Sequence, residues 1–362
     1  MSSKERNKSA LHENESAANT NLSQTSAERI KALRRQKIDV EDLIQKILDG
    51  NKTALSRAIT LIESQQKKHN SNIKTIIKSC LPHANKSIRI GITGVPGVGK
   101  STFIESFGRL LISKGKKVAV LAVDPTSSVT RGSILGDKTR MEQLVLEDNA
   151  FIRPTASGES LGGVARKTRE SILLCEAAGF DVILVETVGV GQSETAVHSM
   201  TDFFLLLKLA GAGDELQGIK RGIIEMADAI VINKADGENI KAAKNAKVEF
   251  NRALHMYPAK ENDWTPKVKL ASALKSEGID KIWEMFSKYF ETTKANGYFE
   301  QKRIDQNKFW LKQSIEDALK NNFYQNEKIK SALPKIFKKI ETNETTPFEA
   351  AEYLLDLVNK SK

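Results

Sequence analysis

Short apolar runs alternate with longer amphipathic segments through the middle of this chain, from residue 87 to about residue 274. The runs are rich in Val, Ile and Leu, and they read SIRIGIT, KVAVLAV, AFIRPT, DVILVE, FFLLLKLA, AIVIN and KVKLAS. Continuous apolar runs are typical of strands buried on both faces, and helix-length segments between them indicate crossover helices. We therefore expect an α/β domain over residues 85–293, with a mainly parallel central sheet covered by helices.

Helical patterns flank this domain on both sides. Apolar residues recur at three- and four-residue spacing in VEDLIQKIL, ALSRAITLIES and NIKTIIKSCL, which predicts a helical arm over residues 37–84. Helical periodicity returns after residue 275, with a long stretch from Tyr298 to Ile340, and we expect a second arm over residues 294–362. Its large aromatic residues favour packing within the chain or a dimer surface. Residues 1–36 are rich in Ser, Asn, Lys and Glu, which predicts a disordered polar tail.

The composition is that of an ordinary folded protein and excludes several classes. Of the 362 residues, 40% are hydrophobic and 28% charged, and the first residues, MSSKERNKSALHENE, lack an apolar signal core. No apolar run is long enough for a bilayer, so we expect a cytoplasmic protein without a membrane partner. The two cysteines and five histidines show no metal-binding spacing. The net charge of +11 is spread along helical stretches, which favours a solvated surface over nucleic acid.

The run SIRIGIT leads into GVPGVGKST, in which Gly94-x-x-x-x-Gly99-Lys100-Ser101 has the full spacing of a phosphate-binding loop. Glycines let backbone N–H groups turn toward phosphate oxygens, and the helix that follows adds its positive N-terminal end. We expect Lys100 to contact the β- and γ-phosphates, Ser101 to bind Mg²⁺, and Thr102 to lie near the α-phosphate. The predicted phosphate-binding positions are Gly94, Val95, Pro96, Gly97, Val98, Gly99, Lys100, Ser101 and Thr102.

Acidic residues follow the strands at the same edge of the predicted sheet. Asp124 comes directly after KVAVLAV, Asp137 lies in ILGDKTR, and Glu186 ends DVILVE. Because a parallel sheet binds ligands beyond the carboxyl ends of its strands, these carboxylates are candidate Mg²⁺ ligands together with Ser101. In ETVGVGQ, the N–H of Gly189 is placed to sense the γ-phosphate. A helix cap or a solvated surface acid is the alternative for each carboxylate.

A guanine-reading motif follows the run AIVI. A carboxylate at Asp236 can accept hydrogen bonds from both N1–H and the exocyclic amine of guanine, whereas adenine offers no matching pair of donors. The Lys234 stem can lie along the base, and the N–H of Ala273 in LASAL can meet guanine O6. The motif therefore predicts GTP rather than ATP. The predicted base-binding positions are Asn233, Lys234, Asp236, Ser272, Ala273 and Leu274.

The run FFLLLKLA leads into GAGDELQGIKRG, a charged segment with four glycines. Such a segment at the phosphate edge favours a mobile loop that changes position when the γ-phosphate leaves. A solvated connection without a role is the alternative. From the residues alone, the chain is a GTP-driven switch with an unknown client.

Taken together, GITGVPGVGKST, VDPTS, GSILGDKTRM, SGESLGG, VETVGVGQSE, GAGDELQGIKRG and NKAD closely resemble, in order and spacing, the motifs of the GTPase associated with methylmalonyl-CoA mutase. This family includes a bacterial metallochaperone and its mitochondrial counterpart in the cobalamin pathway. The resemblance covers about residues 40–295. It implies a P-loop G domain, a homodimer formed through the C-terminal arm, and slow hydrolysis of GTP to GDP that the mutase accelerates. The hydrolysis gates loading of adenosylcobalamin into the mutase and removal of damaged cofactor.

The same resemblance implies roles for individual residues. The implied catalytic residues are Lys100, Asp124, Glu186, Gln217 and Lys220. The implied Mg²⁺ ligands are Ser101, Asp124, Asp137 and Glu186. Asp214, Gln217 and Lys220 belong by resemblance to a switch loop through which the mutase stimulates hydrolysis, and Arg140 resembles a residue of a second switch.

Other functions are compatible with parts of the sequence. A nucleotidase or kinase that regulates a basic amino acid (arginine/ornithine) transport system would use a periplasmic binding protein as phosphate acceptor. A nickel chaperone would share the G domain, but the chain has no His-rich tract or Cys/His cluster for the metal. An RNA-binding role rests only on the basic charge, and it requires binding that survives moderate salt.

Overall fold

The computed structural model describes residues 39–64, 66, 69–123, 141–154, 161–187, 193–211, 221–258 and 260–359. Within these residues, one sheet has the strand order β3-β2-β4-β1-β5-β6-β7, and all neighbouring strands are parallel. The strands are β1 (Ile88–Gly94), β2 (Val118–Val123), β3 (Ala150–Pro154), β4 (Val182–Thr187), β5 (Phe203–Lys208), β6 (Ala229–Ile232) and β7 (Lys267–Leu270). Each predicted apolar run is a strand, which confirms the α/β fold with a parallel sheet.

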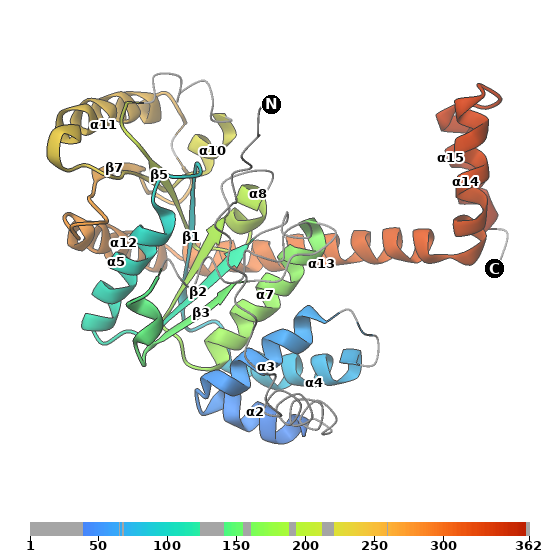
Figure 1. Ribbon diagram of the computed structural model, residues 1–362, viewed down its shortest axis with the longest axis horizontal. Coiled ribbons are helices and arrows are strands. Elements are labelled where there is room, and N and C mark those ends of the chain that lie inside the picture. Colours follow the sequence, from blue (N-terminus) through green and yellow to red (C-terminus); the bar gives the residue numbers. More distant parts are fainter. Residues whose placement is uncertain are drawn as a thin grey trace, which may run out of the picture.

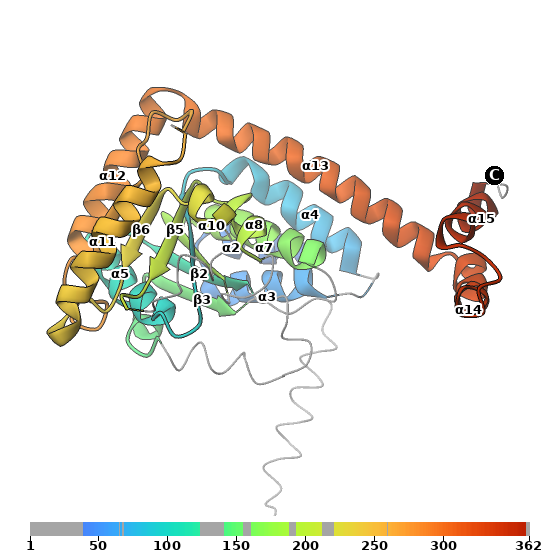
Figure 2. The ribbon, with the colours of Figure 1, turned by 90° about the horizontal axis from the view of Figure 1, so that it is seen from above.

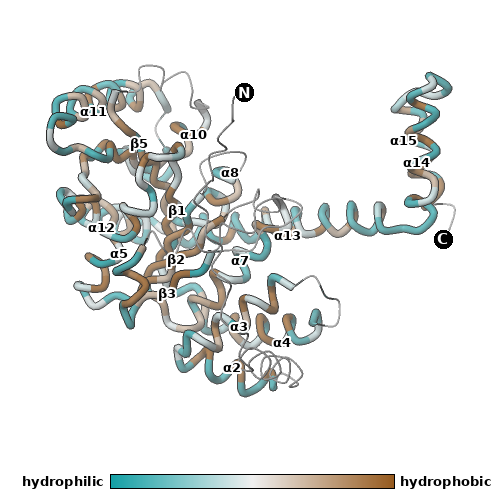
Figure 3. The backbone as a smooth tube through the Cα atoms, viewed as in Figure 1, coloured by the Kyte–Doolittle hydropathy of each residue, from teal (hydrophilic) through white to brown (hydrophobic). Residues whose placement is uncertain are grey.

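Helices cover both faces of the sheet because successive strand residues point to opposite sides (Figure 1). In β2, Val118 and Val120 pack in the core beneath α5 and α12, whereas Ala119 and Leu121 pack beneath α7 and the N-terminal helices. Figure 3 shows this hydrophobic centre in brown. The helices between strands are α5 (Lys100–Ser113), α7 (Leu161–Ala177), α8 (Ser193–His198), α10 (Arg221–Met226) and α11 (Ile240–His255), with the 3-10 turns η3 (Leu144–Leu146) and η4 (Gly237–Asn239).

The N-terminal arm consists of α2 (Val40–Leu48), α3 (Lys52–Glu63), α4 (Asn70–Cys80) and the 3-10 turn η2 (Leu81–His83). Asp39 caps α2 by accepting from the backbone N–H of Glu41 and of Asp42, each at 3.1 Å. The buried faces of the arm, with Leu55 and Ile59 fully covered, pack in the same core as α7. The arm is therefore anchored on the sheet face that α7 covers.

The C-terminal part begins with α12 (Ile279–Ala295), whose Phe286 and Tyr289 are buried against the sheet. The next helix, α13 (Tyr298–Gln325), lies along the body of the protein for its first half and then projects away from it (Figure 2). Its tip carries α14 (Glu327–Glu341) and α15 (Pro347–Asn359), which pack around a small core of their own. Among the described helices, none is both long enough and apolar enough to span a bilayer.

The stretch from Tyr298 to Ile340 is two helices rather than one. Asn326 has extended backbone angles, with ψ 128°, and its side chain accepts from the N–H of Lys328 at 2.9 Å. An Asn that caps the following helix also ends the preceding one, because its own backbone is not helical. This break turns α14 away from the axis of α13 (Figure 1).

Candidate nucleotide-binding site

The loops at the carboxyl edge of the sheet bring the phosphate and base motifs together. In the strand order, β1 lies between β4 and β5, and β6 follows β5. The register pairs Ile92 of β1 with Glu186 of β4, and Gly94 of β1 with Leu207 of β5. The residues that follow β1, β4 and β6 therefore meet at one edge, which is where sheets of this kind bind ligands.

The first and last glycines of the loop from Gly94 to Gly99 lie where a side chain would not fit. A Cβ atom on Gly94 would lie 2.6 Å from the carbonyl oxygen of Leu207. Gly99 has a φ of 91°, and an added Cβ would lie 2.8 Å from Asn233 Nδ2. Helix α5 begins directly after the loop, at Lys100, and its first N–H groups have no acceptors within the helix. An anion held in the loop would gain those hydrogen bonds and the favourable helix dipole.

Lys100 folds back over this loop. The residue is only 8% exposed, and its Nζ donates to the carbonyl oxygens of Gly94 at 2.9 Å and Val95 at 3.4 Å. These bonds hold the ammonium group against the inside of the loop. A phosphate that enters would meet a positive charge already in position, so little reorganisation is needed.

A hydroxyl and a carboxylate face each other beside the loop. Ser101 Oγ donates to Glu186 Oε1 at 3.5 Å, and Glu186 is 7% exposed. The buried Thr187 hydroxyl donates to Thr93 Oγ1 at 2.9 Å and joins the ends of β4 and β1. Hard oxygen ligands of this kind suit Mg²⁺, so Ser101 and Glu186 fit the predicted metal. Within the described part of the chain, no three His, Cys, Asp or Glu side chains form a metal-binding group.

Asn233 connects the base motif to the phosphate loop. Its Nδ2 donates to the carbonyl oxygen of Val98 at 2.9 Å, and its Oδ1 accepts from the N–H of Ala273 at 3.1 Å. Asn233 is 1% exposed, so water does not compete for either bond. One side chain thus fixes the phosphate loop and the 272–274 segment relative to each other.

The other base-motif residues lie around Asn233. Half-buried Asp236 accepts a hydrogen bond from Ser272 Oγ, and the same Ser272 oxygen accepts from the N–H of Lys275 at 3.2 Å. Lys234 has a left-handed backbone, with φ 55°, and is exposed beside the phosphate loop. Leu274 is exposed to solvent. The acidic group of the motif is therefore held in place by a neutral hydroxyl.

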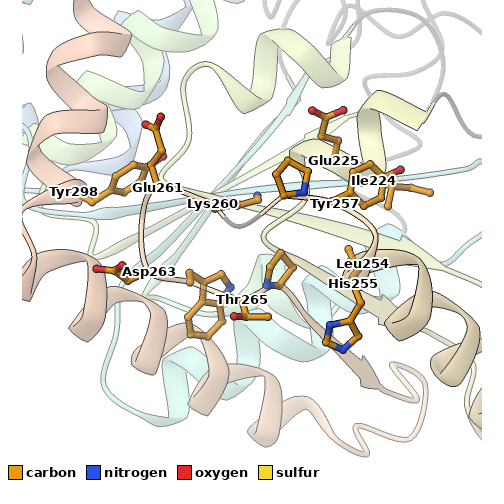
Figure 4. Close-up of a pocket in the computed structure, with 13 residues that line it drawn as sticks. Ile224, Glu225, Leu254, His255, Tyr257, Lys260, Glu261, Asp263, Thr265 and Tyr298 are labelled. Carbon is orange, nitrogen blue, oxygen red and sulfur yellow. The ribbon is translucent and has the colours of Figure 1, made fainter.

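A cavity of about 530 Å³ joins these groups. It is lined by Pro96, Gly97, Gly99, Lys100, Ser101, Thr102, Ala122, Glu186, Thr187 and Lys234. Two other hollows have similar volumes. One, of about 570 Å³, lies among α10, the end of α11 and the start of α13 (Figure 4), and one, of about 430 Å³, lies among η2, α7 and α13. Volume alone does not separate the three hollows. The cavity of about 530 Å³ combines a phosphate loop, a buried lysine and a carboxylate, which makes it the candidate nucleotide site.

The sequence matches the family model of the methylmalonyl-CoA mutase-associated GTPase MeaB over residues 55–328. The chain belongs to this family. The match and the phosphate-loop geometry together make it a P-loop GTPase, and they confirm the resemblance seen in the motifs.

Relatives of this GTPase carry two kinds of name. GTPase ArgK of Escherichia coli is 44% identical over 315 residues, which cover 87% of this chain and 95% of that protein. The methylmalonic aciduria type A homolog, mitochondrial, of Mus musculus is 41% identical over 326 residues, which cover 87% of this chain and 79% of that protein. The crystal structure of LAO/AO transport system kinase superposes with a TM-score of 0.72 at 36% identity, and covers 90% of this chain and all of that one.

Several predicted residues of this GTPase lie outside the described residues, and their roles stay predictions. They are Asp124, Asp137, Arg140, Gly189, Asp214, Gln217 and Lys220. The described part of the predicted site therefore consists of the phosphate loop, Glu186 and the base motif.

Sequence reasoning missed one charged residue at the same edge. Lys208 ends β5, is fully buried, and places its Nζ 5.5 Å from the ring centroid of Phe250. A ring face stabilises a nearby cation, most strongly where water is excluded. A single lysine in the apolar run FFLLLKLA was the signal that could have found it, because a lysine is rarely buried completely unless it is paired or functional.

Proposed function

We propose that this GTPase binds GTP with Mg²⁺ at the carboxyl edge and hydrolyses it as a chaperone of methylmalonyl-CoA mutase or a related acyl-CoA mutase. The nucleotide part rests on Asn233, which joins the phosphate loop to the base motif through two buried hydrogen bonds. The family description and the relative named methylmalonic aciduria type A homolog support the mutase part. In this function, hydrolysis controls loading of adenosylcobalamin, and removal of damaged cofactor, in the mutase.

Each described residue has a distinct task in this reaction. Lys100 holds the β- and γ-phosphates, and Ser101 and Glu186 would hold Mg²⁺, which neutralises phosphate charge when bound. Water attacks the γ-phosphorus while the bond to the β,γ-bridging oxygen breaks, and GDP leaves with that oxygen. The attacking water loses its proton to the released phosphate or to solvent. Gln217, Lys220 and Asp124 are the predicted residues for orienting the water and stabilising the transferred group.

Asp236→Asn tests guanine recognition. The amide presents a donor to the N1–H and exocyclic amine of guanine, so binding of GTP should weaken by about 1 to 3 kcal/mol. Xanthosine triphosphate has a carbonyl in place of that amine, and the variant should bind it more tightly than GTP. Calorimetric titration measures both affinities. Glu238→Gln, at an exposed neighbouring position, is the matched control and should bind GTP as the unchanged protein does.

Equal affinity of the unchanged protein for GTP and ATP would contradict guanine recognition. Loss of GTP binding by Asp236→Asn without any gain for xanthosine triphosphate would show instead that the side chain supports the fold of the site.

The mutase part is tested by the rate of GTP turnover with and without purified methylmalonyl-CoA mutase. We expect the active mutase to raise turnover, and heat-denatured mutase to have no effect. Lys220→Ala should reduce the stimulated rate more than the basal rate. No stimulation by any acyl-CoA mutase of the same organism would end this proposal while leaving GTP binding intact.

A second candidate function is nucleotide-dependent regulation of basic amino acid transport. It is favoured by the names of GTPase ArgK and of the LAO/AO transport system kinase, the latter similar over most of both chains. Transfer of radiolabelled γ-phosphate to a periplasmic binding protein would support it. Release of the label only as inorganic phosphate would favour the chaperone function.

The projecting C-terminal arm is the proposed homodimer surface. Ile315 and Leu319 lie one turn apart on α13 and are 51% and 63% exposed, and Phe348 at the tip is 85% exposed. Burying such side chains against a second copy would add about 1.5 to 3 kcal/mol each. Light scattering after size exclusion should show a dimer for the unchanged chain and a monomer for Ile315→Glu with Leu319→Glu.

A further inference from the structure

The hollow of about 430 Å³ lies away from the nucleotide site, where three parts of the chain meet. The segment before β1 contributes Leu81, Ala84 and Asn85, the G domain contributes Arg89 and one side of α7, and α13 contributes the turns around Trp310. None of the predicted nucleotide-binding residues lines it. Its volume lies within the range of about 300 to 1,000 Å³ that small-molecule sites occupy.

Arg169 carries the charge that distinguishes this hollow. Its guanidinium donates to the carbonyl oxygen of Gln306 at 3.2 Å and to Asn307 Oδ1, and it lies 5.6 Å from the ring centroid of Trp310. All of these partners are neutral. Within the described residues, Arg169 forms no ion pair with a carboxylate.

The carboxylates near Arg169 are already paired with other arginines. Glu176 accepts from Arg89 at 2.9 Å, and Glu170 accepts from Arg166 at 3.0 Å. Three guanidinium groups therefore share two carboxylates, so the positive charges in this group exceed the negative charges by one. Burial, and then the charge of Arg89, lower the pKa of Arg169 to about 10, although the charge of Glu176 opposes this. The guanidinium is held where its charged form is poorly solvated, and an anion would relieve that cost.

Apolar groups surround the charge. Leu311 and Leu81 lie at the mouth and are 63% and 53% exposed, and Trp310 forms part of the wall at 8% exposed. An inorganic anion would satisfy Arg169 but leave these side chains in contact with water. A carboxylate attached to an apolar body would satisfy both kinds of group.

We propose that this hollow binds a small organic acid, with its carboxylate on the Arg169 guanidinium and its apolar body against Trp310, Leu311 and Leu81. The larger hollow of Figure 4 lacks the features that favour binding of an organic acid. There Lys260 already donates to Met226 O, Ala227 O and Asp228 Oδ1, and Glu225 and Glu261 are exposed to solvent. Among the described residues, the charged groups that line that hollow are either paired or exposed.

Occupancy would affect how both arms are attached. The acid would contact the Leu81–Asn85 segment, α7 and α13 at once, so binding stabilises the arrangement in which all three are together. A small acid would thereby act on the arms at a position remote from the nucleotide. This inference does not depend on the proposed mutase partner.

The three tryptophans of the chain allow a direct test by ¹⁹F NMR of 5-fluorotryptophan-labelled protein. Trp310 lines this hollow, Trp264 lines the hollow of Figure 4, and Trp283 packs against Phe107 near the core. Phenylacetate is the probe, and phenylacetamide, which has the same shape without the charge, is its control. We expect phenylacetate to shift the Trp310 resonance saturably, and the other two resonances to stay in place.

Two variants check the assignment. Arg169→Gln should weaken phenylacetate binding by about ten-fold or more, since the charge-assisted pair with the half-buried guanidinium is lost. Ser314→Glu, at an exposed position of the wall, should weaken binding by charge repulsion without disturbing the fold. Arg252→Gln and Ser331→Glu, exposed and distant, are the matched controls and should bind as the unchanged protein does.

The proposal is overturned if phenylacetate at concentrations up to about 10 mM causes no saturable shift of the Trp310 resonance, because a dissociation constant above that concentration corresponds to negligible binding. An equal shift by phenylacetamide, or unchanged affinity in both Arg169→Gln and Ser314→Glu, would overturn it as well. GTP binding measured on the same samples separates loss of this site from general unfolding.

Discussion

The two edges of the parallel sheet use charge in opposite ways. At the carboxyl edge, Lys100 donates to the carbonyl oxygens of Gly94 and Val95 beside the nucleotide loop, and Asp236 of the base motif accepts from the Ser272 hydroxyl. At the amino edge, Arg303 donates to Asp202 at 2.7 Å and Lys260 donates to Asp228 at 2.7 Å. Charged groups at the first edge line the candidate ligand site, whereas those at the second pair with one another.

The amino edge explains how the arms are attached. Arg303 of α13 also donates to the carbonyl oxygens of Asn85 and Ser87, at 2.9 and 2.6 Å, so it joins the C-terminal helix to the segment before β1. Burial opposes the charge of Arg303, but its hydrogen bonds with Asp202 outweigh that effect and raise its pKa. One network therefore fixes the start of two strands and the docked half of α13. Stability and ligand binding are placed at opposite ends of the same strands.

The largest expected effect on stability is that of Arg303→Met. The change leaves the Asp202 carboxylate buried, at 2% side-chain exposure, without its ion-pair partner. Removing one partner of a buried pair costs about 3 to 5 kcal/mol. The free energy of unfolding, measured by urea denaturation, should fall by that amount.

The matched control is Lys308→Met, five residues further along the same helix. Lys308 pairs with Asp305, but both side chains are more than half exposed. Such a pair contributes about 0 to 1 kcal/mol, so the change should be small. Comparable losses from the two variants would contradict the difference drawn between buried and exposed pairs.

A smaller effect is expected from pH through His198, which stacks edge-to-face on Phe204 beside the amino-edge network. Burial, and then the charge of Lys302, lower its pKa from 6.5 to about 4, while Asp228 opposes this and Lys260 adds to it. Between about pH 4 and 6.5, His198 is therefore protonated in the unfolded chain but neutral in the folded chain. The stability that neutral His198 contributes is complete above about pH 6.5 and is lost as the pH falls toward 4.

The expected loss is about 2 to 3 kcal/mol between pH 7 and pH 4.5, from 1.36 kcal/mol per pKa unit. Urea denaturation across this range measures it. His198→Gln removes the titrating group, so the variant should show a flatter dependence of stability on pH. An identical slope in both proteins would assign the pH dependence to other groups.

Much of the carboxyl edge could be predicted from the sequence because its signals are local. Strands buried on both faces read as continuous apolar runs, and the phosphate loop and the base motif each occupy a few consecutive residues after such a run. Their meeting point then follows from the rule for parallel sheets. The sequence did not indicate that Asn233 acts as a bridge. One of its hydrogen bonds reaches Val98, 135 residues earlier in the chain, and the other reaches Ala273, 40 residues later.

The amino edge was not predictable in the same way. Asp202 and Arg303 are 101 residues apart, and Lys260 and Asp228 are 32 apart, so no spacing links them. A weak signal was present, because Asp202 and Asp228 directly precede strands, where a charge next to buried backbone requires a partner. The partner's identity depended on where α13 docks. That docking is a tertiary contact, and the helical periodicity of α13 does not predict which part of the chain the helix packs against.

The smallest expected effect on stability belongs to Lys100→Met at the carboxyl edge, and it sharpens the comparison most. Because Lys100 lines the nucleotide cavity and donates to the carbonyl oxygens of Gly94 and Val95, which are neutral acceptors, its removal should change the free energy of unfolding by about 1 kcal/mol or less. GTP turnover should fall by about a hundred-fold or more, since a pre-positioned charge on the phosphates is lost. Urea denaturation and phosphate release on the same sample measure the two quantities. A stability loss as large as that of Arg303→Met would mean that the loop lysine supports the fold, and that the division of roles between the two edges is wrong.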